Sequence, residues 1–232
     1  MRFTSSGEID DTFRVALPDG TALAIDAAGA AGDGASVWAS SWLGGVQSLH
    51  LLGTDGQPVR SFPLQLSRDG RTTISLSAVV GVPGGAVIGG GFDAVNRVRA
   101  PGVARIDADG NVDTTWGGWF VEGTLASSIV RAGNGLMHVA GSLRTPTGTA
   151  ATTLLRADGL PEFNAPQAVT PGTRVAPLAP AGDWLAHLAP NETGVRRWQV
   201  SPAPDVPLVV PDQPVGVGES GDRSRGTGDR AE

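Results

Sequence analysis

The sequence predicts an all-β fold, and its glycine and proline content is the first observation behind this prediction. The 232 residues include 34 Gly and 17 Pro, and both residue types are unfavourable inside helices. The remaining apolar residues, within a hydrophobic content of 40%, fall in short runs of strand length that are separated by turns. A helical bundle is therefore disfavoured, and the chain has the size of one ordinary domain.

An internal repeat is the second observation. An aromatic residue recurs about every 50 residues, at Phe13, Phe62, Trp116 and Phe163. An Asp-Gly pair precedes three of these aromatic residues, at Asp55-Gly56, Asp109-Gly110 and Asp158-Gly159. Asp-Gly suits the primed hairpin turns, which match the twist of the strands that they connect. Each repeat is therefore expected to hold three or four short antiparallel strands.

The repeat divides the chain into units at about residues 14–62, 63–116, 117–163 and 164–210, with residues 1–13 as a partial repeat. In the second unit, strands are expected at about residues 72–80, 86–92, 102–106 and 112–116. Strands this short need a face that is buried against a neighbouring sheet, so the units should stack. The predicted architecture is a β-propeller-like array of about four blades, and a β-sandwich with accidental spacing is the alternative.

Residues 103–116, which read Val-Ala-Arg-Ile-Asp-Ala-Asp-Gly-Asn-Val-Asp-Thr-Thr-Trp, carry a recognisable pattern. They resemble the bacterial delta-60 repeat, whose signature is Ala-Arg-Leu-Asn-x-Asp-Gly-x-Leu-Asp-x-x-Phe, and residues 85–92 are similar to its glycine-rich second strand. Residues 2–13 align with residues 105–116 without a gap. The third and fourth units depart further from the pattern, and the fourth has lost the Asp-Gly pair. The resemblance covers about residues 2–200, and it implies a β-propeller but almost nothing about activity.

Four units are few for a closed ring, and the sequence begins inside a repeat. Three arrangements are compatible with this start. The N-terminal strand could complete the last blade, a symmetric partner could complete the ring in a homo-oligomer, or an open β-repeat could be capped by a larger neighbour. Residues 211–232 are polar and rich in glycine and charge, so we expect a disordered tail, or else a docking peptide that orders on a partner.

The charge and residue content excludes several classes of function. Acidic residues outnumber basic ones by 23 to 17, and every basic residue is arginine, so we expect no nucleic-acid partner. The absence of Cys excludes disulfides and thiolate metal sites. No apolar run has the length of a membrane span and no secretion signal is visible, so we expect no membrane partner. An extracellular or virion-associated location is favoured.

Tryptophan and arginine residues supply the candidate binding residues. Trp38 and Trp42 lie four residues apart and share a strand face, whereas Trp119 lies at a unit boundary beside Trp116. Indole rings stack on sugars and on protein surfaces, but they also pack between blades, as we expect of Trp116. Short basic pairs complete the candidate set, which is Trp38, Trp42, Trp119, Arg97 and Arg99.

One turn has the spacing of a calcium loop, since carboxylates and an amide alternate around Gly110. The candidate ligands are Asp107, Asp109, Asn111 and Asp113, and a plain hairpin turn is the alternative. No other cofactor is expected. The three histidines, His50, His138 and His187, are far apart in the sequence and are expected to be structural.

Catalytic motifs such as Gly-x-Ser-x-Gly and His-Glu-x-x-His are absent from the sequence, so we do not expect an enzyme. The favoured function is a non-catalytic binding or scaffold module that contacts protein or glycan. The alternative is a structural subunit of a phage or phage-like particle, such as a tail, spike or fibre component. A propeller-type hydrolase or lyase is the third hypothesis.

Overall fold

The computed structural model describes residues 7–10, 12–17, 23–31, 36–43, 45–69, 74–162, 176–181, 184–188 and 195–199. Within these ranges there is no helix, and the strands form antiparallel sheets. The predicted all-β fold class is confirmed. The predicted tail at residues 211–232, residues 1–6 of the partial repeat and the closing aromatic Phe163 lie outside the described residues.

Four sheets are meanders, in which each strand pairs with the next strand along the sheet. The first sheet contains β1 (Ile25–Ala30), β2 (Val37–Leu43), β3 (Val46–Leu52) and β4 (Pro58–Leu64). The second contains β6 (Leu76–Val82), β7 (Gly85–Gly90) and β10 (Val103–Asp107). The third contains β11 (Leu125–Arg131), β12 (Met137–Thr145) and β13 (Gly148–Leu155). The fourth contains β14 (Ala176–Ala181), β15 (Trp184–Leu188) and β16 (Val195–Gln199).

A fifth, small sheet was not expected from the sequence. It contains β5 (Leu66–Ser67), β8 (Ala94–Val95) and β9 (Val98–Arg99), in the order β5-β8-β9. It forms because the segment between β7 and β10 folds into a hairpin that pairs with the chain just after β4. In contrast, the strand expected at residues 112–116 is reduced to a single bridge between Ile106 and Val112.

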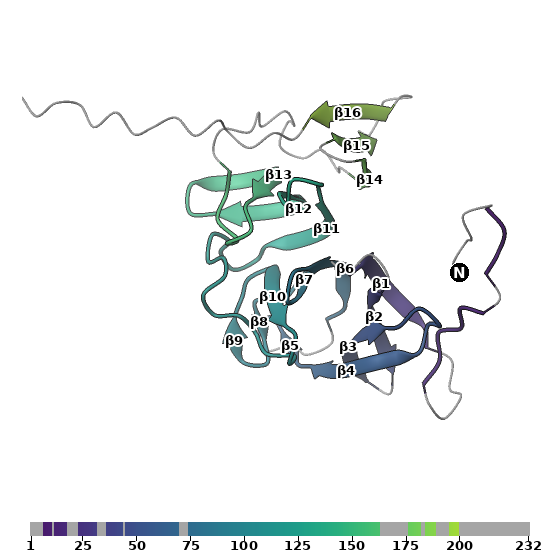
Figure 1. Cartoon of the computed structure of the whole chain (residues 1–232). Coiled ribbons are helices and arrows are strands. Elements are labelled where there is room, and N and C mark those ends of the chain that lie inside the picture. Colours follow the sequence, from purple (N-terminus) through teal and green to yellow (C-terminus); the bar gives the residue numbers. More distant parts are fainter. Residues whose placement is uncertain are drawn as a thin grey trace, which may run out of the picture.

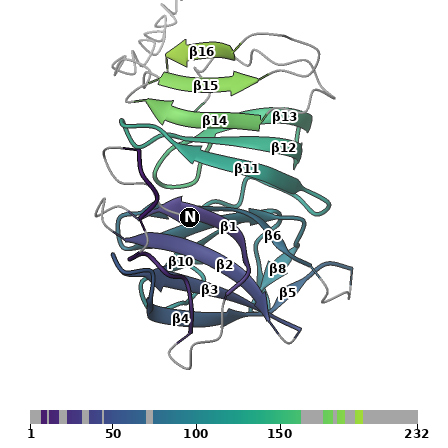
Figure 2. The ribbon, with the colours of Figure 1, turned by 90° about the vertical axis from the view of Figure 1, so that its right-hand side faces the viewer.

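The four meander sheets follow one another in space in chain order (Figures 1 and 2). Their first strands are neighbours, since β6 lies against both β1 and β11, and β11 lies against β14. A β-bulge interrupts each of these first strands at corresponding places, between Ile25 and Ala27, Leu76 and Ala78, Ala126 and Ser128, and Pro177 and Ala179. Bulges increase local twist and bend a strand, so the first strands share the same deformation at the spacing of the sequence repeat.

The core consists of layers between consecutive sheets, and the alternation of strand residues builds it. In β7, Ala86 and Ile88 belong to the layer shared with the first sheet, whereas Val87 belongs to the layer shared with the third sheet. Side chains in a strand point alternately to opposite faces, so an uninterrupted apolar run contributes side chains to both core layers. The second sheet is therefore covered on both faces, and all six residues of β7 are buried.

The closing aromatic of one unit packs against the Asp-Gly turn of the next unit. The ring of Phe62 lies against Gly110, and the indole of Trp116 lies against Gly159, so closely in both cases that a Cβ atom would overlap the ring. The Trp116 indole also donates a hydrogen bond from Nε1 to the carbonyl of Ala157, at 2.9 Å. The expected packing role of Trp116 between units is confirmed, since it also contacts the core layer of the second and third sheets.

The N-terminal partial repeat makes local contacts that match those around Trp116. The backbone N–H of Thr12 donates to Asp10 Oδ1 at 3.0 Å, as the N–H of Thr115 does to Asp113 Oδ1. The N–H of Arg14, which follows Phe13, donates to the carbonyl of Asp55 at 3.0 Å. These contacts support the alignment of residues 2–13 with residues 105–116 over the part that the structure describes.

Candidate functional site

A pocket of about 930 Å³ lies where the first sheet meets the small fifth sheet. Its volume falls in the range of about 300–1,000 Å³ that is usual for ligand sites. Its lining includes Trp42, Gln47, Gln65, Ser67, Ile74 and Arg97. They come from the first and second predicted units, so the pocket exists only because these two units are packed together.

Trp42 reaches the pocket from the end of β2, where its side chain is half-buried. Trp38 occupies the same face of β2, as expected, but it is only 4% exposed and stacks on Phe62 with ring centroids 6.2 Å apart. The prediction that Trp38 contributes to a binding surface is therefore corrected. One face of a strand can be covered at one end and open at the other, which sequence spacing does not reveal.

Arg97 reaches the same pocket from the two-residue turn between β8 and β9. Asn96 and Arg97 have φ values of 49° and 67°, as a type I′ hairpin turn requires at both central residues. Glycine is preferred at the second of these positions, and for other residues the left-handed conformation costs about 1–2 kcal/mol. An arginine therefore occupies this position against its conformational preference.

Two hydrogen bonds attach this turn to the pocket wall. The N–H of Asn96 donates to the carbonyl of Gln65, and the N–H of Gln65 donates to Asn96 Oδ1, both at 2.8 Å. Because Gln65 directly follows β4 and also lines the pocket, the backbone beneath Arg97 is held in a fixed position relative to the first sheet. Sequence reasoning missed the roles of Asn96 and Gln65. The Asn at the turn was the available signal, since Asn tolerates positive φ.

The polar side chains at the pocket differ in whether they are already hydrogen-bonded within the protein. Gln47 is 2% exposed. Its Nε2 donates to the carbonyl of Ser41 at 2.9 Å and to Asp26 Oδ2 at 3.5 Å, while its Oε1 accepts from the N–H of Leu76 at 3.4 Å. Its amide is therefore committed to holding β3 against the neighbouring strands. The side chain of Gln65 is exposed and that of Ser67 is half-buried, so both can reach a bound molecule.

The pocket lining carries a single kind of charge. Among the described residues that line it, Arg97 is the only charged one, and they include neither a carboxylate nor a histidine. Whatever occupies the pocket therefore meets one guanidinium, one indole, an amide and a hydroxyl within a largely apolar surface.

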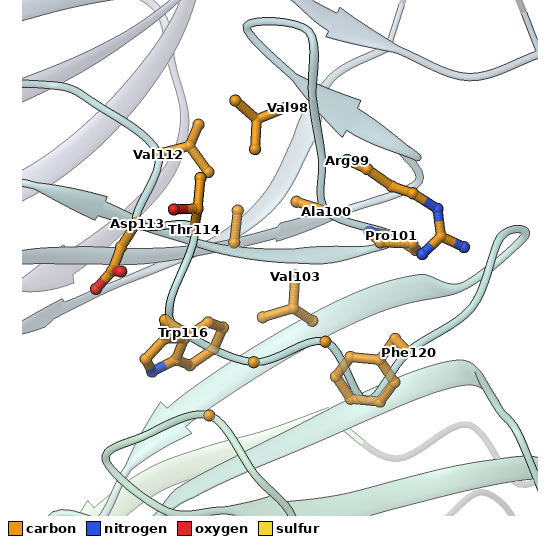
Figure 3. A pocket seen from close by; sticks show the side chains of 14 residues that line it. Val98, Arg99, Ala100, Pro101, Val103, Val112, Asp113, Thr114, Trp116 and Phe120 are labelled. Atoms are coloured by element: carbon orange, nitrogen blue, oxygen red, sulfur yellow. The ribbon is translucent and has the colours of Figure 1, made fainter.

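The other two predicted binding residues lie elsewhere. Arg99 is exposed and pairs with Glu122, with Nε and Oε1 3.4 Å apart. It borders a smaller pocket of about 120 Å³, in which Trp116 and Phe120 face Val98 and Val112 (Figure 3). Trp119 is half-buried and packs against the core layer between the second and third sheets. The structure thus brings together Trp42 and Arg97 and separates them from Trp119 and Arg99.

The candidate calcium loop uses its carboxylates to hold its own turn. Asp107 Oδ1 accepts from the N–H groups of Asp109 and Asn111, at 2.9 and 2.8 Å. The hydrogen bond from the N–H of Asn111 is the main cause that lowers the pKa of Asp107. Asp113 accepts from Thr115 and pairs with Arg105 at 2.9 Å. These contacts correspond to the plain-turn alternative, and calcium binding here stays a prediction.

In the described part of the chain, no three His, Asp or Glu side chains are placed together so that they could hold one metal ion. The described part also contains no helix with the length and hydropathy to cross a membrane.

His50 is a buried polar residue whose two ring nitrogens both have hydrogen-bond partners. It is 3% exposed, its Nε2 lies 2.8 Å from Ser41 Oγ, and its Nδ1 lies 2.8 Å from Ser61 Oγ. The three side chains lie side by side across β2, β3 and β4, and burial lowers the pKa of His50. This arrangement fits the structural role expected for His50, because its contacts with the two serines link the three strands.

A comparison with protein-family models finds no match to this chain, and a comparison with curated proteins finds no significant relative. The fold and the geometry of the pocket are therefore the grounds on which a function can be argued.

Proposed function

We propose that the protein is a non-catalytic binding module for protein or glycan, and that its binding site is the pocket between Trp42 and Arg97. The observation that carries this proposal is the convergence of these two side chains on one pocket of about 930 Å³ from different units of the chain. Aromatic and arginine side chains are the residues most often responsible for recognition at binding surfaces. The proposal also includes a propeller-like arrangement of the four sheets, supported by their neighbouring first strands and the bulges in these strands.

The chemistry of the lining supports binding over catalysis. General acid–base catalysis needs a group such as histidine or a carboxylate within reach of the substrate, and the described lining residues supply neither. The guanidinium of Arg97 can hold a ligand through charge and paired hydrogen bonds, which suits a binding role.

The proposal is tested by screening the purified protein against an immobilised panel of glycans and extracellular proteins. We expect at least one panel member to bind the wild type and to bind the Trp42→Ala variant about tenfold more weakly or worse, because the indole is part of the contact. Val59→Ser is the matched control, since Val59 is 66% exposed on β4 and does not line the pocket. Binding that is equal in wild type and Trp42→Ala would contradict the assignment of the site.

A further inference from the structure

We infer that the ligand of this pocket is an acidic carbohydrate, that is, a sugar chain whose units carry carboxylates, an inference that rests on the binding function proposed above. Four observations carry it: the lack of an ion pair at Arg97 among the described residues, the backbone conformation at that residue, the side chains beside it, and the prolines of the neighbouring edge strand.

Arg97 differs from the other arginines of this region in its partners. Arg99 and Arg105 each pair with a carboxylate, and Arg68 donates to the carbonyl of Gly91 at 3.3 Å. Within the described part of the chain, Arg97 makes neither kind of contact.

A planar guanidinium binds a carboxylate through two parallel hydrogen bonds. No acidic side chain is among the described residues that line the pocket, and a carboxylate beside them, that of Asp26, lies 3.5 Å from the Nε2 of Gln47. An anionic ligand would therefore be attracted mainly by Arg97, in a protein whose net charge is −6.

The backbone at Arg97 points to a role outside folding. Glycine would fit the φ of 67° without strain, and the side chain of Arg97 makes no hydrogen bond within the described residues. Residues held in an unfavourable conformation without a structural benefit are candidates for function. The turn that carries Arg97 is also fixed by the two hydrogen bonds between Asn96 and Gln65, so the guanidinium is presented from a rigid base.

The neighbouring side chains suit a sugar. The half-buried indole of Trp42 offers a flat apolar surface to the C–H face of a pyranose ring, and indole rings combine such a surface with a polar N–H. The exposed amide of Gln65 and the hydroxyl of Ser67 can hydrogen-bond to sugar hydroxyls. Together with Arg97, the pocket presents one partner for each kind of group on a uronic-acid or sialic-acid unit.

A peptide ligand is less well matched to this surface. Extended peptides commonly bind by adding a strand to a sheet edge, and β4 is the edge strand of the first sheet. Pro58 and Pro63 lie within β4, and proline has no N–H to donate to an added strand. The edge beside the pocket is therefore protected against strand addition.

The inference is tested by isothermal titration with trigalacturonate, a glucuronate oligosaccharide, a mannuronate oligosaccharide and sialyllactose. The neutral counterparts are the methyl esters of the three uronate oligosaccharides, and lactose for sialyllactose. We expect at least one acidic sugar to bind, and its neutral counterpart to bind about tenfold more weakly or worse, because a charge-assisted pair is lost.

Arg97→Gly separates a binding role from a structural one. We expect this variant to lose binding of the acidic sugar by about tenfold or more, while its melting temperature stays unchanged or rises, because glycine relieves the strain at positive φ. Arg99→Gln is the matched control, since it removes an exposed arginine two residues away that already pairs with Glu122, and it should leave binding unchanged.

The outcomes separate this inference from the proposed function. Binding of an acidic sugar that survives Arg97→Gly unchanged would overturn the inference, and so would failure of all four acidic sugars to bind. Binding of a neutral sugar, a polyglutamate peptide or a protein that depends on Trp42 would overturn the acidic-sugar inference but uphold the binding module. Absence of any binding that depends on Trp42 would overturn both.

Discussion

The indole of Trp116 lies so close to Gly159 that a Cβ atom at residue 159 would be 2.7 Å from Cδ2 of the ring. The two residues belong to consecutive units, and the N–H of Gly117 donates to the carbonyl of Asp158 beside them, at 3.1 Å. The corresponding hydrogen bond at the junction between the N-terminal partial repeat and the first unit joins Arg14 to Asp55. At the junction between the first and second units, the residue after Phe62 is Pro63, which has no N–H to donate. The ring of Phe62 therefore contacts Gly110 there without a corresponding backbone hydrogen bond.

Gly159→Ala should destabilise the protein more than Gly117→Ala, although both glycines have a φ of +80°. At Gly117 a Cβ would meet nothing within 4 Å, so only the backbone conformation opposes alanine, at about 1–2 kcal/mol. At Gly159 the added methyl group would also meet the backbone nitrogen of Gly117 at 2.6 Å and the indole of Trp116 at 2.7 Å, and displacing them should add about 1–3 kcal/mol, as overpacking does. Urea unfolding of both variants measures the difference, and equal losses would show that the ring yields without cost.

Trp116→Phe and Trp116→Ala should separate the hydrogen bond of the indole from its packing. Phenylalanine keeps a ring on Gly159 but removes the hydrogen bond to the Ala157 carbonyl, so we expect a loss of about 1 kcal/mol. Alanine removes the ring as well, and we expect a loss of about 2–4 kcal/mol, somewhat below the cost for a fully buried ring because Trp116 is half-buried. A Trp116→Ala protein with the wild-type midpoint in urea would contradict the packing role between units.

The sequence was sufficient to predict the sheets, because their determinants are local and repeated. Short apolar runs, Asp-Gly turns and closing aromatic residues recur in each of the first three units, and each of these units contains one antiparallel meander. The small sheet of β5, β8 and β9 was missed because its strands have only two residues each. Such short segments carry no periodicity, and their pairing depends on a contact between the chain after β4 and a distant hairpin.

The candidate site was only partly predictable for a related reason. Residue type identified Trp42 and Arg97, but it also selected Trp38 and Arg99, which have the same chemistry. Tertiary contacts distinguish Trp42 from Trp38 and Arg97 from Arg99, because Phe62 covers Trp38 and Glu122 pairs with Arg99. Arg97 lies at the pocket because the turn at Asn96 is hydrogen-bonded to Gln65, and these two residues are 31 positions apart in the sequence.

Trp38→Ala and Trp42→Ala should differ sharply in stability although the two residues share a strand face. Trp38 is buried in the core layer between the first two sheets, so its truncation should cost about 3–5 kcal/mol. Trp42 is half-buried at the pocket, and its truncation should cost clearly less because part of the ring is already in water. Thermal unfolding of the two variants measures this contrast. Comparable losses would show that Trp42 is a core residue and would weaken its use as a probe of binding.

The stability of the protein should decrease as the pH is lowered from about 6.5 towards the lower pKa that His50 has in the folded protein. Burial lowers the pKa of His50 from its ordinary value of 6.5, so the unfolded chain binds a proton in a range of pH where the folded protein does not. The stabilisation is therefore fully present above pH 6.5 and is lost progressively as the pH falls below it. The lowered pKa values of Asp107, Asp113 and Asp158 act in a separate window, below their ordinary value of 3.8.

His50→Gln isolates this dependence, because glutamine can hydrogen-bond to Ser41 and Ser61 but does not titrate. Urea unfolding at pH 7.5 and pH 5.5 should show that the wild type loses more free energy of unfolding on acidification than the variant does. The two hydroxyl groups at 2.8 Å can accept hydrogen bonds from a protonated ring, so the loss should stay modest and should not unfold the protein at pH 5.5. Equal losses in wild type and variant would show that the pH dependence arises elsewhere, and that the serine pair compensates the burial of a charged His50.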